Sequence, residues 1–229
     1  MSKPVCAIVG IGPGNGAAFA RQFDREGYAL ALLSRSASYS AELAGDLQEA
    51  RAYACDASDP ASVKEAFSQV RNDLGEVDVL IYNAGSGSWK NAEEITPEEF
   101  ELGWRINALG ALVSSQQVIP SMKKKRAGSI IFIGATASLR GAAMTAGFAS
   151  AKAAQRILAQ SMAKQLGPQG IHVSVMIIDG RIRPPDKEPA DDGEQLEPAD
   201  IATLAHYLTT QPGSAWSFEV DVRPMREKW

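Results

Sequence analysis

Cysteine and histidine are scarce in this sequence, with two residues of each in a chain of 229. Cys6 and Cys55 each lie in a strand-like run without the spacing of a metal site, so we predict that both are small buried hydrophobic residues. His172 and His206 fall in a predicted strand and a predicted helix, and we interpret both as structural. The sequence therefore contains no pattern that indicates a metal centre.

Long apolar runs are also missing, since no segment approaches the roughly 20 apolar residues that a membrane-spanning helix needs. Residues 1–4 are too short for a secretory signal, and the apolar run at 5–9 leads directly into glycines. The formal net charge of -4 weighs against nucleic acid or an anionic membrane as a partner. We therefore expect a cytoplasmic protein with neither of these partners.

Short apolar runs alternate with helical segments along the whole chain. The expected strands cover residues 5–9, 28–33, 52–54, 77–82, 129–133, 172–178 and 217–222, and the expected helices cover 17–26, 41–48, 61–73, 97–124, 145–166 and 198–211. Strands that alternate with helices predict a parallel sheet covered on both faces. We therefore expect an α/β fold: a single Rossmann-like domain over residues 1–229, with a doubly wound parallel sheet of about seven strands.

One stretch, residues 184–198, is rich in Pro, Asp and Glu. In an α/β domain such a loop is often a mobile lid beside a site, although it could also be a disordered surface loop.

Glycines gather between the first expected strand and the first expected helix. The residues expected to contact a ligand there are Gly10, Gly12, Gly14, Asn15 and Gly16. Glycines permit a sharp turn and let a pyrophosphate approach backbone N–H groups at a helix N-terminus. The pattern predicts a dinucleotide site, with a glycine-rich turn that binds no ligand as the alternative.

The end of the second expected strand indicates which dinucleotide is bound. The sequence there is Ser34-Arg35-Ser36, which has no carboxylate to accept hydrogen bonds from a ribose 2′-hydroxyl. A guanidinium between two hydroxyls suits a 2′-phosphate instead. We therefore expect NADP(H) in preference to NAD(H), unless Arg35 only forms a surface salt bridge.

Taken together, these motifs resemble those of the short-chain dehydrogenase/reductase family over nearly the whole chain. The spacing Gly10-x-x-x-Gly14-x-Gly16 is similar to the glycine motif of that family. Further residues that match cofactor-binding positions are Asp56 with its neighbour Ala57, the motif Asn83-Ala84-Gly85, and Lys152. The resemblance implies a nicotinamide-dependent oxidoreductase that acts on a carbonyl or alcohol. It also implies a homodimer or homotetramer formed through the two long helices, about 97–124 and 145–166.

The resemblance breaks down at two of the four catalytic positions. It implies a Ser that holds the substrate carbonyl, a Tyr that transfers the proton, a Lys on the nicotinamide ribose, and an Asn that supports a relay water. Asn107 and Lys152 match, but Ala135 stands at the Ser position and Phe148 at the Tyr position. A phenyl ring can neither donate nor accept a proton. The chain is thus similar to an atypical member of the family that lacks the catalytic Ser and Tyr.

Few other residues could replace the missing groups, because no tyrosine lies between Tyr82 and Tyr207. Tyr82 ends the fourth expected strand and is a candidate proton donor, with packing beneath the cofactor as the alternative. The hydroxyl of Thr136 could orient a carbonyl. Asp179 and Gly180 replace a Pro-Gly pair of the family, and the resemblance places them beside the nicotinamide.

Three hypotheses about function follow. The first is an NADP(H)-dependent oxidoreductase with a modified site, because hydride transfer is cofactor chemistry that needs positioning above all. The second is a non-catalytic NADP(H)-binding sensor or regulatory protein. The third, a lyase or isomerase that uses Lys152, is weaker because a lysine held as a cation is a poor nucleophile.

Overall fold

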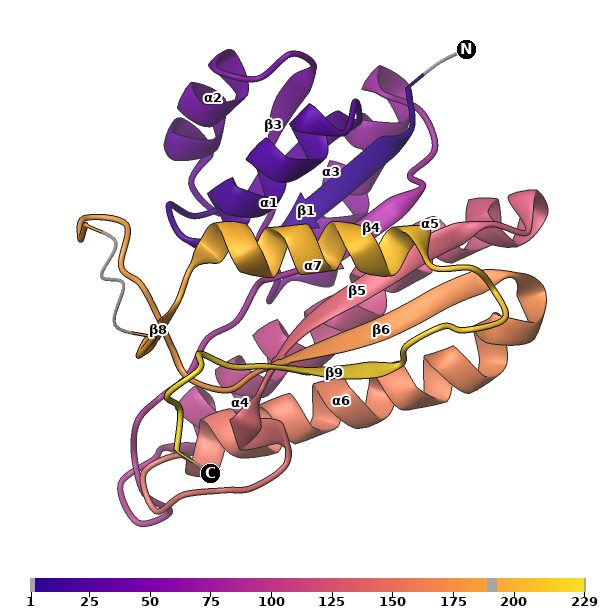
Figure 1. Cartoon of the computed structure of the whole chain (residues 1–229). Coiled ribbons are helices and arrows are strands. Elements are labelled where there is room, and N and C mark those ends of the chain that lie inside the picture. The colour runs from indigo at the N-terminus through magenta and orange to yellow at the C-terminus, as the bar shows by residue number, and fades with distance from the viewer. Residues whose placement is uncertain (1–2, 189–192, 229) are drawn as a thin grey trace.

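A parallel seven-stranded sheet forms the centre of the computed structural model, which describes residues 3–188 and 193–228 (Figure 1). Its strand order is β3-β2-β1-β4-β5-β6-β9, and every neighbouring pair is parallel. The strands are β1 (Val5–Val9), β2 (Ala29–Ser34), β3 (Ala50–Ala54), β4 (Val79–Tyr82), β5 (Gly128–Ala135), β6 (Ile171–Ile178) and β9 (Glu219–Val222). The sheet confirms the predicted Rossmann-like fold.

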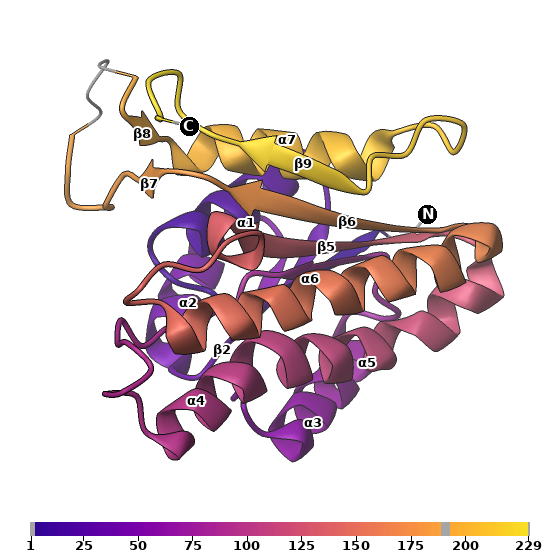
Figure 2. The same cartoon turned by 90° about the horizontal axis from the view of Figure 1, so that it is seen from below.

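Helices cover both faces of this sheet (Figure 2). The helices are α1 (Asn15–Arg25), α2 (Ala37–Gly45), α3 (Pro60–Asp73), α4 (Pro97–Trp104), α5 (Gly110–Lys125), α6 (Ala146–Leu166) and α7 (Pro198–Thr210). Buried residues of α1, α2 and α7 pack on one face, and those of α3, α5 and α6 pack on the other. Within β1, Ala7 belongs to one layer and Ile8 to the other, and both are fully buried. Burial on both faces explains why the strands are continuous apolar runs.

The position of the ligand crevice follows from the strand order. β1 pairs with β2 on one side and with β4 on the other, so the loops after β1 and β4 diverge from adjacent strands. In open α/β sheets, ligands bind at such a switch point, outside the carboxyl ends of the strands. Gly10 follows β1 and Asn83 follows β4, which puts two of the predicted cofactor residues at this point.

Two helices, α3 and α4, begin with side-chain caps. The Asp59 carboxylate accepts a hydrogen bond from the Ala61 N–H at 2.9 Å, ahead of Pro60 at the first helical position of α3. Thr96 and Glu99 form a reciprocal capping box at the start of α4. Both caps satisfy N–H groups that have no partner within the helix.

The predicted helix over 97–124 is helical throughout, but a π-helical segment, Arg105–Leu109, lies between α4 and α5 and was not predicted. Two side chains bind carbonyl groups of this segment: the Tyr82 hydroxyl donates to the Ile106 carbonyl, and Gln155 Nε2 donates to the Asn107 carbonyl at 3.1 Å. At the start of α5, a side chain on Gly110 would collide with the Tyr82 hydroxyl. We infer that these tertiary contacts hold the wider helical turn in place.

Part of the region 184–198 pairs with the residues just before it, which the sequence did not predict. Arg181–Ile182 (β7) and Gln195–Leu196 (β8) form a small parallel pair, and the Arg183 guanidinium contacts the Glu197 carboxylate at 2.7 Å. Part of the predicted lid, residues 189–192, lies outside the described residues.

Both cysteines and His172 are buried, as expected for residues with a structural role. Cys6 and Cys55 are buried and unpaired with each other, and burial raises the pKa of the Cys55 thiol to about 12. His172 is buried, stacks on Trp216 with 4.8 Å between ring centroids, and bonds the Leu208 carbonyl at 3.0 Å. Within residues 3–188 and 193–228, no group of metal-ligating side chains is found. None of the helices described is both long and apolar enough to span a bilayer.

Candidate active site

Two adjoining cavities lie at the carboxyl end of the sheet. The first, of about 320 Å³, lies at the carboxyl ends of β1, β2 and β4. The second, of about 530 Å³, lies between the loop after β4 and the N-terminal part of α6. Of the predicted site residues, the first cavity is lined by Gly10, Ser34, Arg35, Asp56, Ala57, Asn83, Ala84 and Gly85. The second is lined by Asn15, Asn83, Gly85, Ala135, Thr136, Phe148, Lys152 and Gly180. Asn83 and Gly85 line both cavities, so the two form one extended site.

The glycine turn after β1 packs tightly against the loop after β4 at Gly10 but is open at Gly12 and Gly14. Gly10 adopts φ +97°, and a Cβ on it would lie 2.6 Å from the Cα of Ala84. Asn83 Nδ2 donates to the Gly10 carbonyl at 2.7 Å, which joins the two loops. A Cβ on Gly12 or Gly14 would meet open space, so the turn leaves room for a ligand beside the N-terminus of α1.

Arg35 is exposed and forms no ion pair with any described residue, so the alternative of a surface salt bridge is not supported. It lines the first cavity and also a shallower hollow beside Gly12 and Ser36. The neighbouring Ser34 hydroxyl donates to the Ser36 carbonyl at 2.7 Å and contacts Ser40 Oγ. The guanidinium is therefore the group best placed to meet an anion at this end.

Asp56 lines the first cavity together with Gly10 and Ile11 of the glycine turn. Its Oδ1 accepts hydrogen bonds from the Ser58 hydroxyl at 2.7 Å and the Ser58 N–H at 2.8 Å. These bonds are the main reason that the pKa of the carboxyl lies below its ordinary value, and the positive charge of Arg35 contributes less. Asp56 is thus an ionised acceptor that lines the cavity.

Lys152 lies at the inner wall of the second cavity and is 5% exposed. Its Nζ donates to the Ile133 carbonyl at 2.8 Å and to Gln155 Oε1 at 3.1 Å. Burial lowers the pKa of this amine to about 8. Lys152 can therefore change its charge in the physiological range.

Asn107 is fully buried behind Gly85, in the π-helical segment. Its Nδ2 donates to the Ser86 and Gly103 carbonyls, while its Oδ1 has no partner among the described residues. Asn107 Oδ1 and Lys152 Nζ each lie 3.4 Å from where a Cβ on Gly85 would stand. An unpaired buried acceptor and an ammonium thus flank the same space.

An aromatic pair forms the outer wall of the second cavity. The rings of Phe148 and Trp89 lie 5.5 Å apart between centroids, inclined at 41°. Phe148 packs closely on Gly87, where an added Cβ would lie 2.7 Å from a ring carbon. Phe148 precedes Lys152 by one turn of α6, so both face the cavity. The wall is apolar at the point where the resemblance implies a phenol.

Tyr82 is placed where it cannot donate a proton to a substrate. It is fully buried among core residues, lines neither cavity, and its hydroxyl donates to the Ile106 carbonyl. Desolvation by burial also raises its pKa well above the ordinary value. The structure agrees with the alternative prediction, in which Tyr82 is a packing residue.

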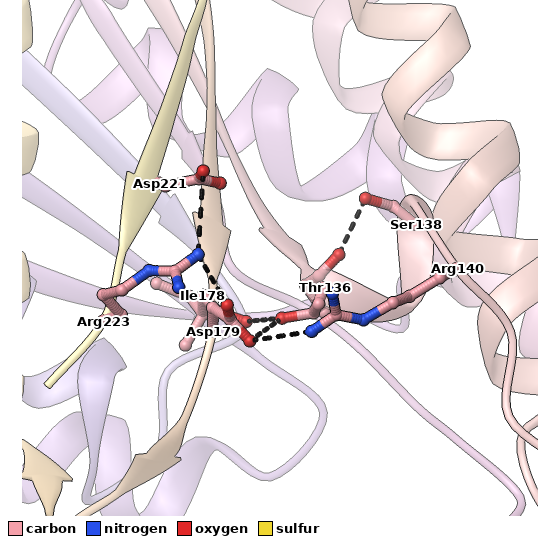
Figure 3. Close-up of polar contacts among 8 residues, drawn as sticks. Thr136, Ser138, Arg140, Ile178, Asp179, Asp221 and Arg223 are labelled. Atoms are coloured by element: carbon pink, nitrogen blue, oxygen red, sulfur yellow. Dashed lines mark hydrogen bonds and ion pairs between the residues drawn. The ribbon is translucent and has the colours of Figure 1, made fainter. Parts of the chain in front are cut away.

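Thr136 lines the second cavity, but its hydroxyl hydrogen is already donated to another group of the protein. Its Oγ1 donates to Asp179 Oδ1 at 2.6 Å and lies 3.1 Å from the Ile178 carbonyl (Figure 3). While these bonds stand, Thr136 cannot donate to a substrate carbonyl. The nearby Ser138 hydroxyl is likewise bound to the Ala135 carbonyl, at 2.7 Å.

The side chain of Asp179 does not reach either cavity, in contrast to the predicted cofactor contact. It is 6% exposed and lies between Thr136, Arg140 and Arg223, with the Arg223 guanidinium at 2.8 Å and that of Arg140 at 3.9 Å (Figure 3). Its neighbour Gly180 does line the second cavity. Asp179 therefore ties the ends of β5, β6 and β9 together.

We predict that Asp179→Ala lowers the free energy of unfolding by about 3 kcal/mol, because it removes a buried carboxylate that holds charged and hydroxyl groups. Urea denaturation measures this loss. Asp221→Ala is the matched control, since Asp221 is half exposed and lies 3.8 Å from the same guanidinium; it should cost less than about 1 kcal/mol. Equal losses in the two variants would contradict this structural role.

Sequence reasoning missed two residues of the site. Gln155 is 1% exposed and contacts both Lys152 and the Asn107 carbonyl, and Trp89 covers Phe148. A signal existed for Gln155, because a polar residue three positions after a buried lysine shares its helix face. Trp89 lies in a loop and had no comparable signal.

The comparisons with known proteins agree with this arrangement. The profile of the family described as short chain dehydrogenase matches residues 4–184. An uncharacterized oxidoreductase of Staphylococcus epidermidis is 25% identical over 228 residues, 98% of this chain and 99% of that protein. A short-chain dehydrogenase from Rhodopseudomonas palustris is 32% identical, with a TM-score of 0.86 over 96% of this chain and 98% of the other.

A second similar structure was solved in complex with an NADP-type ligand. The alcohol dehydrogenase of the archaeon Thermococcus sibiricus, complexed with 5-hydroxy-NADP, is 27% identical with a TM-score of 0.89, and 99% of each chain is covered. The match of the family profile to most of the sequence, together with the fold, shows that this chain belongs to the short chain dehydrogenase family of oxidoreductases.

Proposed function

We propose that this chain is an NADP(H)-dependent oxidoreductase that transfers hydride between the cofactor and a carbonyl or alcohol, within a single cofactor-binding domain. The observation that carries the proposal is that the glycine turn, Arg35 and Lys152 line one extended site. The site fits a dinucleotide, because the turn at Gly10 excludes a side chain and Asn15 Oδ1 is a buried acceptor without a partner among the described residues. The NADP-type ligand of the Thermococcus sibiricus relative supports the same cofactor.

Different residues along the site bind different parts of the cofactor. Arg35 binds the 2′-phosphate, which favours NADP(H) over NAD(H). Asp56 accepts hydrogen bonds at the adenine end, and the backbone around Gly12 and Gly14 meets the pyrophosphate. Lys152 donates to the nicotinamide ribose. When bound, the cofactor supplies the hydride.

The proton of a reduction comes from water in this proposal. The side chains of Phe148 and Ala135 carry no exchangeable proton, and the Tyr82 and Thr136 hydroxyls donate to other groups of the protein. Asn107 Oδ1 is a buried acceptor without a partner among the described residues, so it can accept a hydrogen bond from a water near Gly85, beside the Lys152 ammonium whose remaining hydrogen is donated to the ribose. Without a positioned side-chain acid, the reaction is slower by about 10²- to 10⁴-fold.

The walls of the second cavity indicate the class of substrate. They include Trp89, Phe148, Ile178 and Ile182. Among the lining residues that the structure describes, Lys152 is the only charged one. An apolar wall with a cation at its base suits an uncharged carbonyl compound with an apolar body. We therefore propose aldehydes, ketones or quinones that are electrophilic enough to react without a strong acid.

The test is NADPH consumption by the purified protein with a panel of reactive aldehydes, ketones and quinones. The proposal expects slow consumption, which Lys152→Met should abolish. Tight NADPH binding without any consumption would reject catalysis.

That second outcome would favour an NADP(H)-binding sensor or regulatory protein. Ala135 and Phe148 support this alternative, because they remove reactive groups while leaving the cofactor end unchanged. A partner screen in the presence and absence of NADPH distinguishes the two, since the sensor requires a cofactor-dependent partner or assembly.

We further propose a homodimer or homotetramer formed through α4, α5 and α6. Leu102 and Trp104 on α4 are 48% and 43% exposed, and Ile157 on α6 is 55% exposed. Burial of such side chains between copies is favourable. Leu102→Glu combined with Ile157→Glu should give monomers by size-exclusion chromatography with light scattering, whereas Met225→Glu, at an 84% exposed position, should not. A wild type that is already monomeric would reject this assembly.

A further inference from the structure

Both polar atoms of the buried Gln155 amide form hydrogen bonds with residues of the candidate site. Its Oε1 accepts a hydrogen bond from Lys152 Nζ at 3.1 Å, and its Nε2 donates to the Asn107 carbonyl at 3.1 Å. At 1% exposure, it has no access to bulk water. A single carboxamide therefore joins the lysine of α6 to the π-helical segment that carries Asn107.

The link restricts where the lysine can direct its hydrogen bonds. An ammonium has three hydrogens, and two of them are donated, to the Ile133 carbonyl and to Gln155 Oε1. Gly85 lies next to Nζ on the cavity side, with the position of an added Cβ 3.4 Å away. The third hydrogen is left for a group in the cavity.

We propose that Gln155 is a positioning residue that fixes the Lys152 ammonium, so that its remaining hydrogen is directed into the second cavity. Gln155 performs this role without touching the cofactor or the substrate. It also holds the Asn107 carbonyl, so that the lysine and the π-helical segment keep one relative position.

The groups packed around Lys152 make its charge sensitive to residue 155. β5 presents the Ile133 carbonyl, the π-helical segment presents the Asn107 amide, and the loop after β4 presents Gly85. None of these groups is titratable, and burial is the cause of the lowered pKa. The Gln155 amide oxygen is therefore a neutral acceptor that stabilises the protonated form.

Two substitutions of similar shape should change this pKa in opposite directions. In Gln155→Met the acceptor is lost, the cation is less stable, and the pKa of Lys152 falls below that of the wild type. In Gln155→Glu a carboxylate faces the ammonium, and the pKa rises. A hydrogen bond to a charged group corresponds to about one pH unit, so we expect shifts of about that size.

The measurement is an NMR titration of protein labelled with ¹³C at lysine Cε. The Lys152 signal is identified by its loss in Lys152→Met. Gln160→Met is the control, because Gln160 is on the same helix and lines neither cavity; the titration of Lys152 in this variant should match that in the wild type. Opposite shifts in the two Gln155 variants support the proposal, and a misfolded variant could not produce them. Unchanged midpoints, or shifts in one direction for both variants, would overturn it.

A second readout concerns the cofactor and rests on the proposed function. The charged lysine donates more strongly to ribose hydroxyls, so NADPH affinity should fall as the pH rises through about 8. This fall should move to higher pH in Gln155→Glu and to lower pH in Gln155→Met. If NADPH does not bind at all, the proposed function fails while the titration still decides the role of Gln155.

Discussion

A chain that carries Phe148→Tyr together with Ala135→Ser should consume NADPH with simple carbonyl compounds about 10²- to 10⁴-fold faster than the wild type. Residues 148 and 152 lie one turn apart on α6 and line the same cavity, and residue 135 ends β5 at that cavity. A phenol at 148 would be close to the ammonium of Lys152, which favours its ionised form and makes it a better acid at neutral pH. The serine would supply the donor that Thr136 cannot.

The two single substitutions and one control substitution without a hydroxyl identify the cause of this gain in turnover. Each single variant should gain less than the pair, because acid and carbonyl donor act on the same oxygen. Phe148→Leu, which changes the ring but adds no hydroxyl, should give no gain. The turnover number with a fixed aldehyde at saturating NADPH is the quantity to compare. A double variant that binds NADPH yet remains as slow as the wild type would mean that positions 135 and 148 are not where the missing groups belong.

The second large effect is expected at the other end of the site. Arg35→Asp should weaken NADPH binding by about 10²-fold, because it removes charge-assisted hydrogen bonds to the 2′-phosphate and adds a repelling carboxylate. NADH has no 2′-phosphate, so its affinity should hold or rise, since an acidic residue there can accept from the ribose hydroxyl.

Titration of cofactor fluorescence with each variant measures both affinities. Arg21→Asp makes the same charge change on α1, away from the cavities, and serves as the control for net charge. It should leave the ratio of the two affinities unchanged. An equal loss for NADPH and NADH in Arg35→Asp would indicate a damaged fold or a guanidinium that does not meet the phosphate.

Local sequence patterns predicted the fold, and many of the residues they singled out line the first cavity. The alternation of apolar strands and helices is a property of adjacent residues, and the structure reproduces its order. Gly10 follows a strand and precedes a helix, so its turn could be placed from neighbours alone. Asp59 and Thr96 cap their helices, and each is followed directly by a proline at the first helical position, which is also a local signal.

The features that were not predicted depend on residues far apart in the sequence. The π-helical segment is associated with Tyr82 and Gln155, which lie 24 and 48 residues from their carbonyl partners. Thr136 lost its predicted role because Asp179, 43 residues later, takes its hydrogen. Such contacts exist only once the strands are aligned, so no local pattern reports them.

The most direct test of the central claim is calorimetric binding of NADPH and NADH to the wild-type protein, followed at once by NADPH consumption with reactive carbonyls. The account predicts tighter binding of NADPH than of NADH, with slow consumption. Binding of neither nucleotide would contradict the assignment of the glycine turn and Arg35, and with it the proposed oxidoreductase.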